Sequence, residues 1–317
     1  MKAPDHNEMY YFKFTILSLA YFFAFSLAIH LIANRRARVY SEMTPVKQTL
    51  YRSYILSIAH AIGCVILSTI SMFYICGDGK TVFNSDECIN TPRYIHIWAL
   101  LHTCGYFLMD FFFMFFIVQG NTALDYQTYA HHLVATATFY QTLYFMDFMV
   151  VFGVMLLFIE VSTIFVSFRW LLFTHGHGDS QLYKVNALIS FVMFLLGRVV
   201  FQFYIVFFIG LDWVYWEYER KNLTFYKALV VTEMAIMVIL SIVLNSYWFI
   251  LMLKMLIRTI KKLMGGNKQE DEEKVELVKA DALAEEADCG SSTQGSNLDG
   301  GEIVEENQQR NNNQVRE

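Results

Sequence analysis

The chain has 317 residues, of which 56% are hydrophobic and 17% aromatic, and its mean hydropathy is +0.37. The apolar residues come in long runs, which excludes an ordinary soluble domain with one buried face. Residues 265–317 hold fourteen acidic and five basic residues, a charge of −9, which leaves +4 for the rest of a chain whose total is −5. No Arg-rich patch occurs, so we expect no nucleic-acid partner. These features predict an all-α polytopic membrane protein.

Seven stretches are long enough to cross a bilayer, which needs about 20 mostly apolar residues. They lie near residues 11–33, 53–75, 94–118, 127–146, 148–173, 185–210 and 228–257. The first run is long enough to span and lacks a small-residue cleavage site, so we expect it to remain as the first helix rather than to act as a cleaved signal peptide. The sequence therefore predicts seven transmembrane helices.

Basic residues beside the spans predict the orientation. The first loop carries Arg35, Arg36, Arg38, Lys47 and Arg52, and the last span is closed by Lys254, Arg258, Lys261 and Lys262. Loops rich in Lys and Arg remain in the cytosol. We therefore expect a cytosolic C-terminus and, with seven spans, an N-terminus in the lumen or outside the cell.

Two further features fall on the predicted lumenal side. The loop from Cys76 to Cys88 is acidic, and its two cysteines are candidates for a disulfide in an oxidising compartment. Asn222, in the sequence Asn222-Leu223-Thr224, is a candidate for N-glycosylation. Both agree with the orientation predicted from the basic residues.

Three ionisable side chains lie at one predicted depth, namely Asp110, His131 and His132. At 1.5 Å per residue, all three are about 6–8 Å from the cytosolic edge of a core about 30 Å thick. A charge at the bilayer centre costs about 2.5–3.5 kcal/mol on insertion scales, so such groups are paired or functional. We expect Asp110 to orient one imidazole and to raise its basicity. Because adjacent helical residues point about 100° apart, one histidine is expected to line the site and the other to support it.

The span at 127–146 is polar beyond its two histidines. It also holds Thr128, Thr136, Thr138, Gln141 and Thr142. These side chains must face protein or a water-filled cavity. Two interpretations remain open: a buried polar seam that only orders the bundle, or a lipid-facing site that opens toward the cytosol.

A second polar group is predicted near the middle of the membrane. Glu160 and Arg198 lie about 6 Å apart in depth, within reach of an arginine side chain, so we expect an ion pair. This pair either neutralises itself and fixes helix packing or binds a polar headgroup. His60, about 10 Å deep, is either an interhelical hydrogen-bond partner or part of the same lipid-binding set. Glu233 has no evident partner in the sequence.

The motifs around these residues resemble the TLC-domain family, which includes ceramide synthases, the TRAM translocon proteins and other lipid-linked proteins of the endoplasmic reticulum. The resemblance rests on GYFLMD at 105–110, YAHH at 129–132 and IEVSTIFVSFRWLL at 159–172, and on the segment 186–198. It implies a helical bundle in the endoplasmic reticulum or another secretory-pathway membrane. It also assigns motif positions to Asp110, His131, His132, Glu160, Ser162, Phe165, Arg169, Trp170, Asn186 and Arg198.

The sequence departs from the ceramide-synthase branch of that family. Synthases follow the histidine pair with an Asn-x-x-Arg-x-Gly segment and a later His-Asp. Here the segment is missing, and Ile159 and Glu160 stand at the later positions. A short basic loop replaces the homeobox-like insert between the first two helices. The chain therefore resembles the non-synthase branch.

The resemblance and the charge distribution divide the chain into three parts. Residues 1–44 form a transmembrane helix and a basic cytosolic loop, residues 45–260 a TLC-like membrane domain, and residues 265–317 an acidic cytosolic tail. The tail has no aromatic residue and a high charge, a composition typical of disorder. Its segment EDEEKVELVKADALAEEAD has the composition of a transient helix.

Three classes of function remain open. The first is a membrane protein of lipid homeostasis with a polar intramembrane lipid-binding site near the cytosolic face. The second is an acyltransferase that transfers an acyl group from acyl-CoA to a lipid amine or hydroxyl, with the histidine pair and Asp110 as its catalytic groups. The third is a trafficking protein that binds partners through its acidic tail. We expect membrane lipids as partners and no metal, because a membrane di-iron enzyme needs several histidine boxes.

Overall fold

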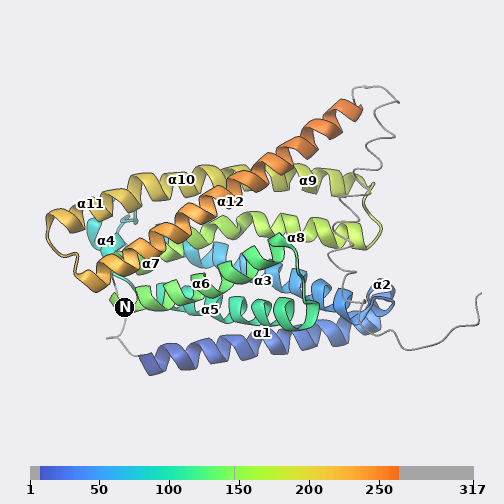
Figure 1. Ribbon diagram of the computed structural model, residues 1–317, viewed down its shortest axis with the longest axis horizontal. Coiled ribbons are helices and arrows are strands. Elements are labelled where there is room, and N and C mark those ends of the chain that lie inside the picture. The colour runs from blue at the N-terminus through green and yellow to red at the C-terminus, as the bar shows by residue number, and fades with distance from the viewer. Residues whose placement is uncertain (1–7, 146, 264–317) are drawn as a thin grey trace, which may run out of the picture.

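The computed structural model describes residues 8–145 and 147–263, and within these ranges it contains helices and turns without strands (Figure 1). The predicted acidic tail, 265–317, lies outside the described residues. The α-helices are α1 Glu8–Arg36, α2 Arg38–Ser41, α3 Pro45–Phe73, α4 Asp86–Asn90, α5 Tyr94–Phe112, α6 Ala123–Phe145, α7 Phe148–Leu156, α8 Val161–Thr174, α9 Gln181–Met193, α10 Gln202–Tyr204, α11 Leu211–Glu219 and α12 Phe225–Leu263. The 3₁₀-helix η2 spans Leu157–Glu160, and the π-helices are η1 Phe113–Val118, η3 Phe194–Phe201 and η4 Ile205–Gly210.

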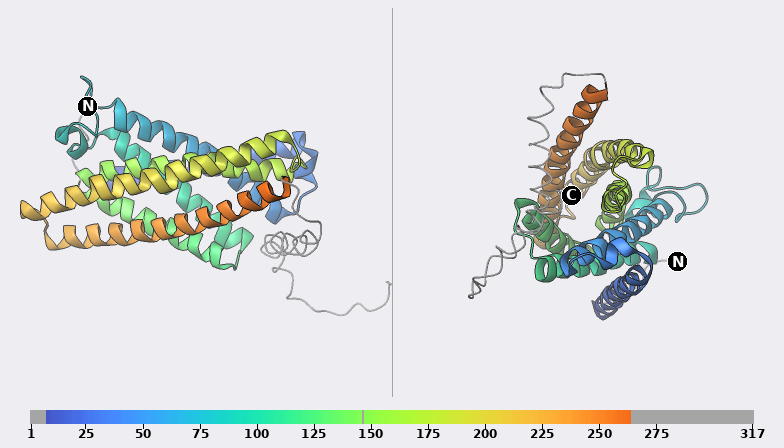
Figure 2. Two further views of the ribbon diagram at one scale, coloured as in Figure 1. Left: turned by 90° about the horizontal axis from the view of Figure 1, so that it is seen from above. Right: turned by 90° about the vertical axis from the view of Figure 1, so that its right-hand side faces the viewer.

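Six helical segments in the described ranges are long and apolar enough to cross a membrane. They are Glu8–Arg36, Pro45–Phe73, Tyr94–Val118, Phe148–Thr174, Gln181–Glu219 and Phe225–Arg258. They form a bundle in which α1 and α12 lie on opposite sides (Figure 2). The protein is therefore an all-α, multi-pass integral membrane protein, as its sequence predicts.

The predicted fourth span forms helix α6, which is not one of these six segments. Its 23 residues are about 34 Å long at 1.5 Å per residue, close to the thickness of a bilayer core. Its low mean hydropathy comes from polar side chains on its inner face: Thr136, Thr138 and Thr142 are all buried, whereas Leu133 is exposed. Seven spans, and the predicted orientation, therefore remain predictions.

The two ends of the bundle carry different features (Figure 1). Helix α1 ends near α2 at one end of the bundle, where the α8–α9 loop also lies. The opposite end carries α4, the turn between α11 and α12, and the start of α1. There Cys76 and Cys88 form a disulfide, and Asn222 lies in an exposed turn. All the segments predicted to be lumenal thus share one end of the bundle.

Helix α1 packs on α5 through small residues. Gly105 faces Ser18, whose hydroxyl donates a hydrogen bond to the carbonyl of His102 over 3.1 Å. A Cβ atom at position 105 would lie 2.4 Å from the Ser18 Oγ and 2.9 Å from the backbone nitrogen of Leu19. Small residues allow such close helix contact in membranes, where packing rather than the hydrophobic effect holds helices together.

We expect Gly105→Ala to lower the free energy of unfolding by about 1–3 kcal/mol, because the added methyl group pushes the α1 backbone away from α5. Unfolding in mixed micelles, followed by tryptophan fluorescence, measures this change. Gly63→Ala is the matched control, since a Cβ there meets only His102 Nε2 at 3.7 Å. Equal stability of the two variants contradicts the close contact.

Candidate functional site

Asp110, Ser53 and His132 meet in the interior of the bundle. Asp110 is in the last turn of α5 and is 5% exposed. The Ser53 hydroxyl of α3 donates a hydrogen bond to one carboxylate oxygen of Asp110. The Nδ1 atom of His132, on α6, lies 3.5 Å from the other oxygen. Three helices therefore bring one carboxylate, one hydroxyl and one imidazole to a single point.

The imidazole of His132 is held in place by stacking. Its ring lies on the ring of Phe107, with centroids 4.6 Å apart and an interplanar angle of 11°. Its Nδ1 atom is buried and makes no hydrogen bond to the described part of the chain, in spite of its proximity to Asp110. A buried polar atom without a partner costs about 1–3 kcal/mol. The site therefore contains a polar group that a small movement or a bound molecule would satisfy.

His131 faces a different part of the interior, as expected for adjacent helical residues. Its ring makes an edge contact with Phe107, with centroids 5.7 Å apart. The structure thus brings His132, rather than His131, to Asp110. Which of the two histidines meets Asp110 depends on the rotation of α6, which the sequence does not determine.

Glu160 and Arg198 form an ion pair, with Arg198 Nη2 at 3.2 Å from Glu160 Oε2. The guanidinium also donates hydrogen bonds to Ser162 Oγ and Thr163 Oγ1, both over 2.7 Å, and to Asn245 Oδ1 over 3.3 Å. Glu160 in turn accepts a hydrogen bond from Thr163 over 2.6 Å. The pair therefore belongs to a network that ties η2, α8, η3 and α12 together.

The sequence analysis missed the α12 part of this network. Asn245 Nδ2 donates to Gln202 Oε1 over 2.8 Å, and Gln202 Nε2 donates to Ser241 Oγ over 3.0 Å. Arg198 and Gln202 are four residues apart, as are Ser241 and Asn245, so each pair lies on one helix face. Such polar pairs within apolar spans are a signal that would have identified these residues.

His60 lies in an aromatic cluster one layer away from Asp110. Its ring stacks on Tyr106, with centroids 4.0 Å apart, and its Nε2 atom is 3.3 Å from Cys64 Sγ. Tyr106 is itself hydrogen-bonded to Ser57 over 2.6 Å. The contacts of His60 are therefore those of an interhelical packing residue.

The remaining motif residues lie along α8 and α9. Asn186 Nδ2 donates to the carbonyl of Phe165 over 2.9 Å. Trp170 stacks on Tyr54 of α3 at 4.2 Å, and the guanidinium of Arg169 lies over a tyrosine ring at 5.9 Å. These contacts hold α8 against α3 and α9.

A further ionic cluster, which the sequence analysis did not predict, lies at the end of the bundle that carries the disulfide. Lys227 Nζ is 2.8 Å from Asp147 Oδ2 and 2.7 Å from Glu217 Oε2, and it lies over the Trp213 ring at 5.1 Å. It links the start of α12 to α11 and to the α6–α7 junction. Nearby, Glu233 accepts a hydrogen bond from Thr138 over 3.3 Å, so it does have a partner.

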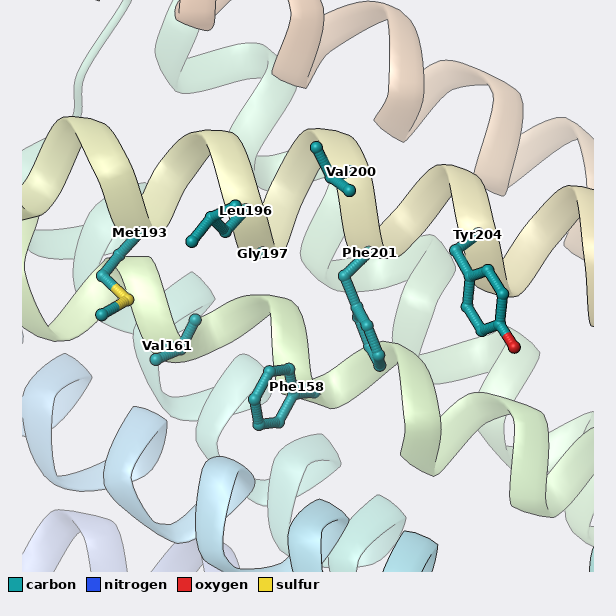
Figure 3. Close-up of a pocket in the computed structure, with 8 residues that line it drawn as sticks. All are labelled: Phe158, Val161, Met193, Leu196, Gly197, Val200, Phe201 and Tyr204. Atoms are coloured by element: carbon teal, nitrogen blue, oxygen red, sulfur yellow. The ribbon is translucent and has the colours of Figure 1, made fainter. Parts of the chain in front are cut away.

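Two apolar grooves lie beside the interior network. One, between η2 and α8 on one side and η3 and α10 on the other, has a volume of about 490 Å³ (Figure 3). The other, of about 310 Å³, is formed by α3, α8 and α9 and includes Phe165 and Asn186. Neither groove includes Asp110 or the histidine pair. Within the described ranges, no group of three or more His, Cys, Asp or Glu residues is placed to hold a metal ion.

The fold and this polar interior define a multi-pass helical membrane protein with paired charges at membrane depth. The chain belongs to the TLC-domain family, since the family model for the TLC domain matches residues 54–254. This confirms the resemblance seen in the sequence motifs.

The relatives found are named TLC domain-containing protein 1. The rat protein is 32% identical over 127 residues, which cover 37% of this chain and 51% of the relative. The human protein is 31% identical over 106 residues (33% and 42%), and the mouse protein 33% identical over 103 residues (32% and 40%). The match thus spans about half or less of each relative's length. None of the three is named for a synthase activity, in agreement with the predicted branch, and no solved structure matches.

Proposed function

We propose that this protein acts in lipid homeostasis of the endoplasmic reticulum membrane and binds a lipid headgroup at Asp110 and His132. The observation that carries the proposal is the buried Nδ1 atom of His132, which lacks a hydrogen bond beside a buried carboxylate. A headgroup hydroxyl or amine that lies beside both atoms, which are 3.5 Å apart, would donate to Asp110 Oδ2 and accept from His132 Nδ1–H. It would thereby satisfy both groups at membrane depth.

The position of the site supports a headgroup rather than an acyl chain as the occupant. Asp110 lies in the last turn of α5, toward the end of the bundle that carries α2 and the α8–α9 loop. The basic residues near α2 predict that this end is cytosolic. The predicted depth of the site is then about 6 Å below the cytosolic edge, close to the level of the lipid headgroups.

We expect His132→Ala to reduce lipid retention about tenfold, equivalent to about 1.4 kcal/mol. The protein is purified in mild detergent, and the lipids that remain bound are identified and counted by native mass spectrometry. His102→Ala is the matched control, because this half-buried imidazole of α5 lies against Phe22 of α1 at 4.8 Å. Equal retention by wild type and His132→Ala contradicts the proposed headgroup site.

A second candidate is an acyl-CoA-dependent acyltransferase, and the proximity of Asp110 to His132 favours it. In this reaction the imidazole accepts the proton of a lipid amine or hydroxyl, whose lone pair attacks the thioester carbonyl and releases the thiolate of CoA. Asp110 would stabilise the resulting imidazolium. Acyl-CoA is a co-substrate here, and the histidine is a general base.

A further inference from the structure

Exposed basic side chains gather at one end of the bundle, where α2 lies, α3 and α9 begin and α12 ends (Figures 1 and 2). We call this set the basic face, and its members are Arg35, Arg36, Arg38, Lys47, Lys184, Lys254 and Arg258. Among the described residues of this end, the exposed acidic side chains are Glu42, paired with Arg38 at 2.7 Å, and Asp179. The other members of the basic face have no carboxylate partner within the described ranges. The basic face therefore carries a positive charge that the described part of the chain does not neutralise.

Helix contacts bring the α3 and α9 parts of the basic face together. The Tyr51 hydroxyl of α3 is hydrogen-bonded to Nε2 of His175, directly after α8, over 3.0 Å. Lys47 precedes Tyr51 by four residues, about one helical turn, so it lies beside the α8–α9 loop. That loop leads directly into the first turn of α9, which carries Lys184.

The α9 and α12 parts of the basic face lie at one level. Phe191 of α9 stacks on Phe249 of α12, with centroids 5.3 Å apart. The two helices run in opposite directions (Figure 1). Lys184, before Phe191, and Arg258, after Phe249, are therefore both displaced toward the same end, by about 10–14 Å at 1.5 Å per residue.

The sequence that follows α12 has the opposite charge. Residues 270–288 hold nine acidic and two basic residues, and α12 ends at Leu263. The intervening residues, 264–269, span about 20 Å when extended. Because neighbouring helix axes are about 8–10 Å apart, the segment 270–288 begins within reach of the ends of α9 and α3.

We propose that residues 270–288 dock on the basic face and cover this end of the bundle. A single exposed ion pair contributes less than about 1 kcal/mol. Attachment to α12, however, gives the segment an effective concentration in the millimolar range, so several weak pairs together hold it. Anionic lipid headgroups, which are drawn to the same cations, must then displace a segment of the same chain. This docking does not depend on the headgroup site at Asp110.

Cys289, directly after this segment, allows the docking to be measured on the full chain. Of the other cysteines, Cys64 and Cys104 are buried and Cys76 and Cys88 form the disulfide, so a maleimide dye is directed to Cys289. In phosphatidylcholine nanodiscs, the anisotropy of the dye reports whether the segment is held against the bundle. We expect the anisotropy to fall between about 0.1 M and about 1 M salt, because the Debye length shortens from about 10 Å to about 3 Å.

Neutralising part of the basic face separates docking from a general effect of salt. Lys47→Gln/Lys184→Gln is expected to remove at least half of the salt-dependent change in anisotropy. The matched control is Arg220→Gln/Lys221→Gln, which removes the same charge from exposed residues at the opposite end of the bundle. The control should behave like wild type, and thermal unfolding checks that both variants are folded.

A second variant changes the nine acidic residues of 270–288 to their amides and leaves the bundle unchanged. It is expected to lose the salt-dependent change altogether. Carbodiimide coupling, which joins a lysine amine to a carboxylate in direct contact, should link the wild-type segment to Lys47 or Lys184, with about threefold lower yield at high salt.

Equal anisotropy of wild type and the amide variant at low salt overturns the proposal. Loss of the difference between them when about one fifth of the lipid is phosphatidylserine also overturns it, because anionic headgroups are then the occupant of the basic face. A difference that persists in this lipid supports docking of the segment.

Discussion

Replacing Arg198 by alanine is expected to lower the free energy of unfolding by about 3–5 kcal/mol. The guanidinium is bonded to Glu160, Ser162, Thr163 and Asn245, so every one of its nitrogen atoms has a partner. Its removal leaves the Glu160 carboxylate without a counter-charge in a low-dielectric interior. It also removes the hydrogen bond from Arg198 to Asn245, which links η3 to α12.

Equilibrium unfolding in mixed micelles measures this loss. Arg220→Ala is the control, because Arg220 is exposed and lies over the Trp216 ring at 5.9 Å without a carboxylate partner in the described ranges. Its expected cost is below about 1 kcal/mol, as for a surface cation. Arg198→Lys should fall between the two, since an ammonium group cannot serve Glu160, Ser162 and Asn245 at the same time. If Arg198→Ala unfolds like Arg220→Ala, the network does not stabilise the fold.

The depth of a residue along its helix was predictable from the sequence. The predicted depths put at one level residues whose side chains meet in the structure. Glu160 and Arg198 were expected about 6 Å apart in depth, and their side chains meet at 3.2 Å. Asp110 and the histidines were expected at one level, and His132 lies 3.5 Å from Asp110. Depth follows from residue count because the rise of a helix is constant.

The rotation of each helix about its own axis was not predictable in the same way, and neither was the partner of each polar side chain. Whether His131 or His132 faces Asp110 depends on how α6 packs against α5 and α12, and a one-residue difference turns the side chain by about 100°. The π-helices are a further reason, because their different residue period shifts the face that Arg198 presents, and no sequence signal marks where they begin. The contact of Lys227 with Asp147 likewise joins residues whose proximity only the assembled bundle creates.

Helix boundaries differ from the apolar runs where a helix begins among polar residues. Helix α3 begins at Pro45, eight residues before the predicted span. Thr44 caps it by accepting a hydrogen bond from the Lys47 nitrogen over 3.4 Å, and proline suits the first helical position. This capping signal was present in the sequence, but hydropathy alone does not detect it.

For the acyltransferase candidate, we expect His132→Ala to lower the rate of acyl transfer about 10²–10⁴-fold, the usual contribution of a general base. Wild type and variant are compared in nanodiscs with labelled acyl-CoA and a panel of lipid amines and alcohols. Asp110→Asn keeps the size of the side chain and removes its charge. It should also slow transfer strongly, because the imidazolium formed in the reaction then lacks its counter-charge.

The same variants separate catalysis from binding, since a headgroup site needs hydrogen bonds at Asp110 whereas a catalyst needs its negative charge. If the Asp110→Asn variant retains lipid like wild type but transfers no acyl group, the result favours the acyltransferase. If the protein only binds lipid, wild type is expected to show no more acyl transfer than the His131→Ala/His132→Ala double variant with any acceptor. The double variant then differs from wild type only in its lower lipid retention. Absence of turnover in wild type across the panel therefore rejects the acyltransferase and leaves the headgroup site standing, because the unpaired Nδ1 atom of His132 needs a polar partner in either case.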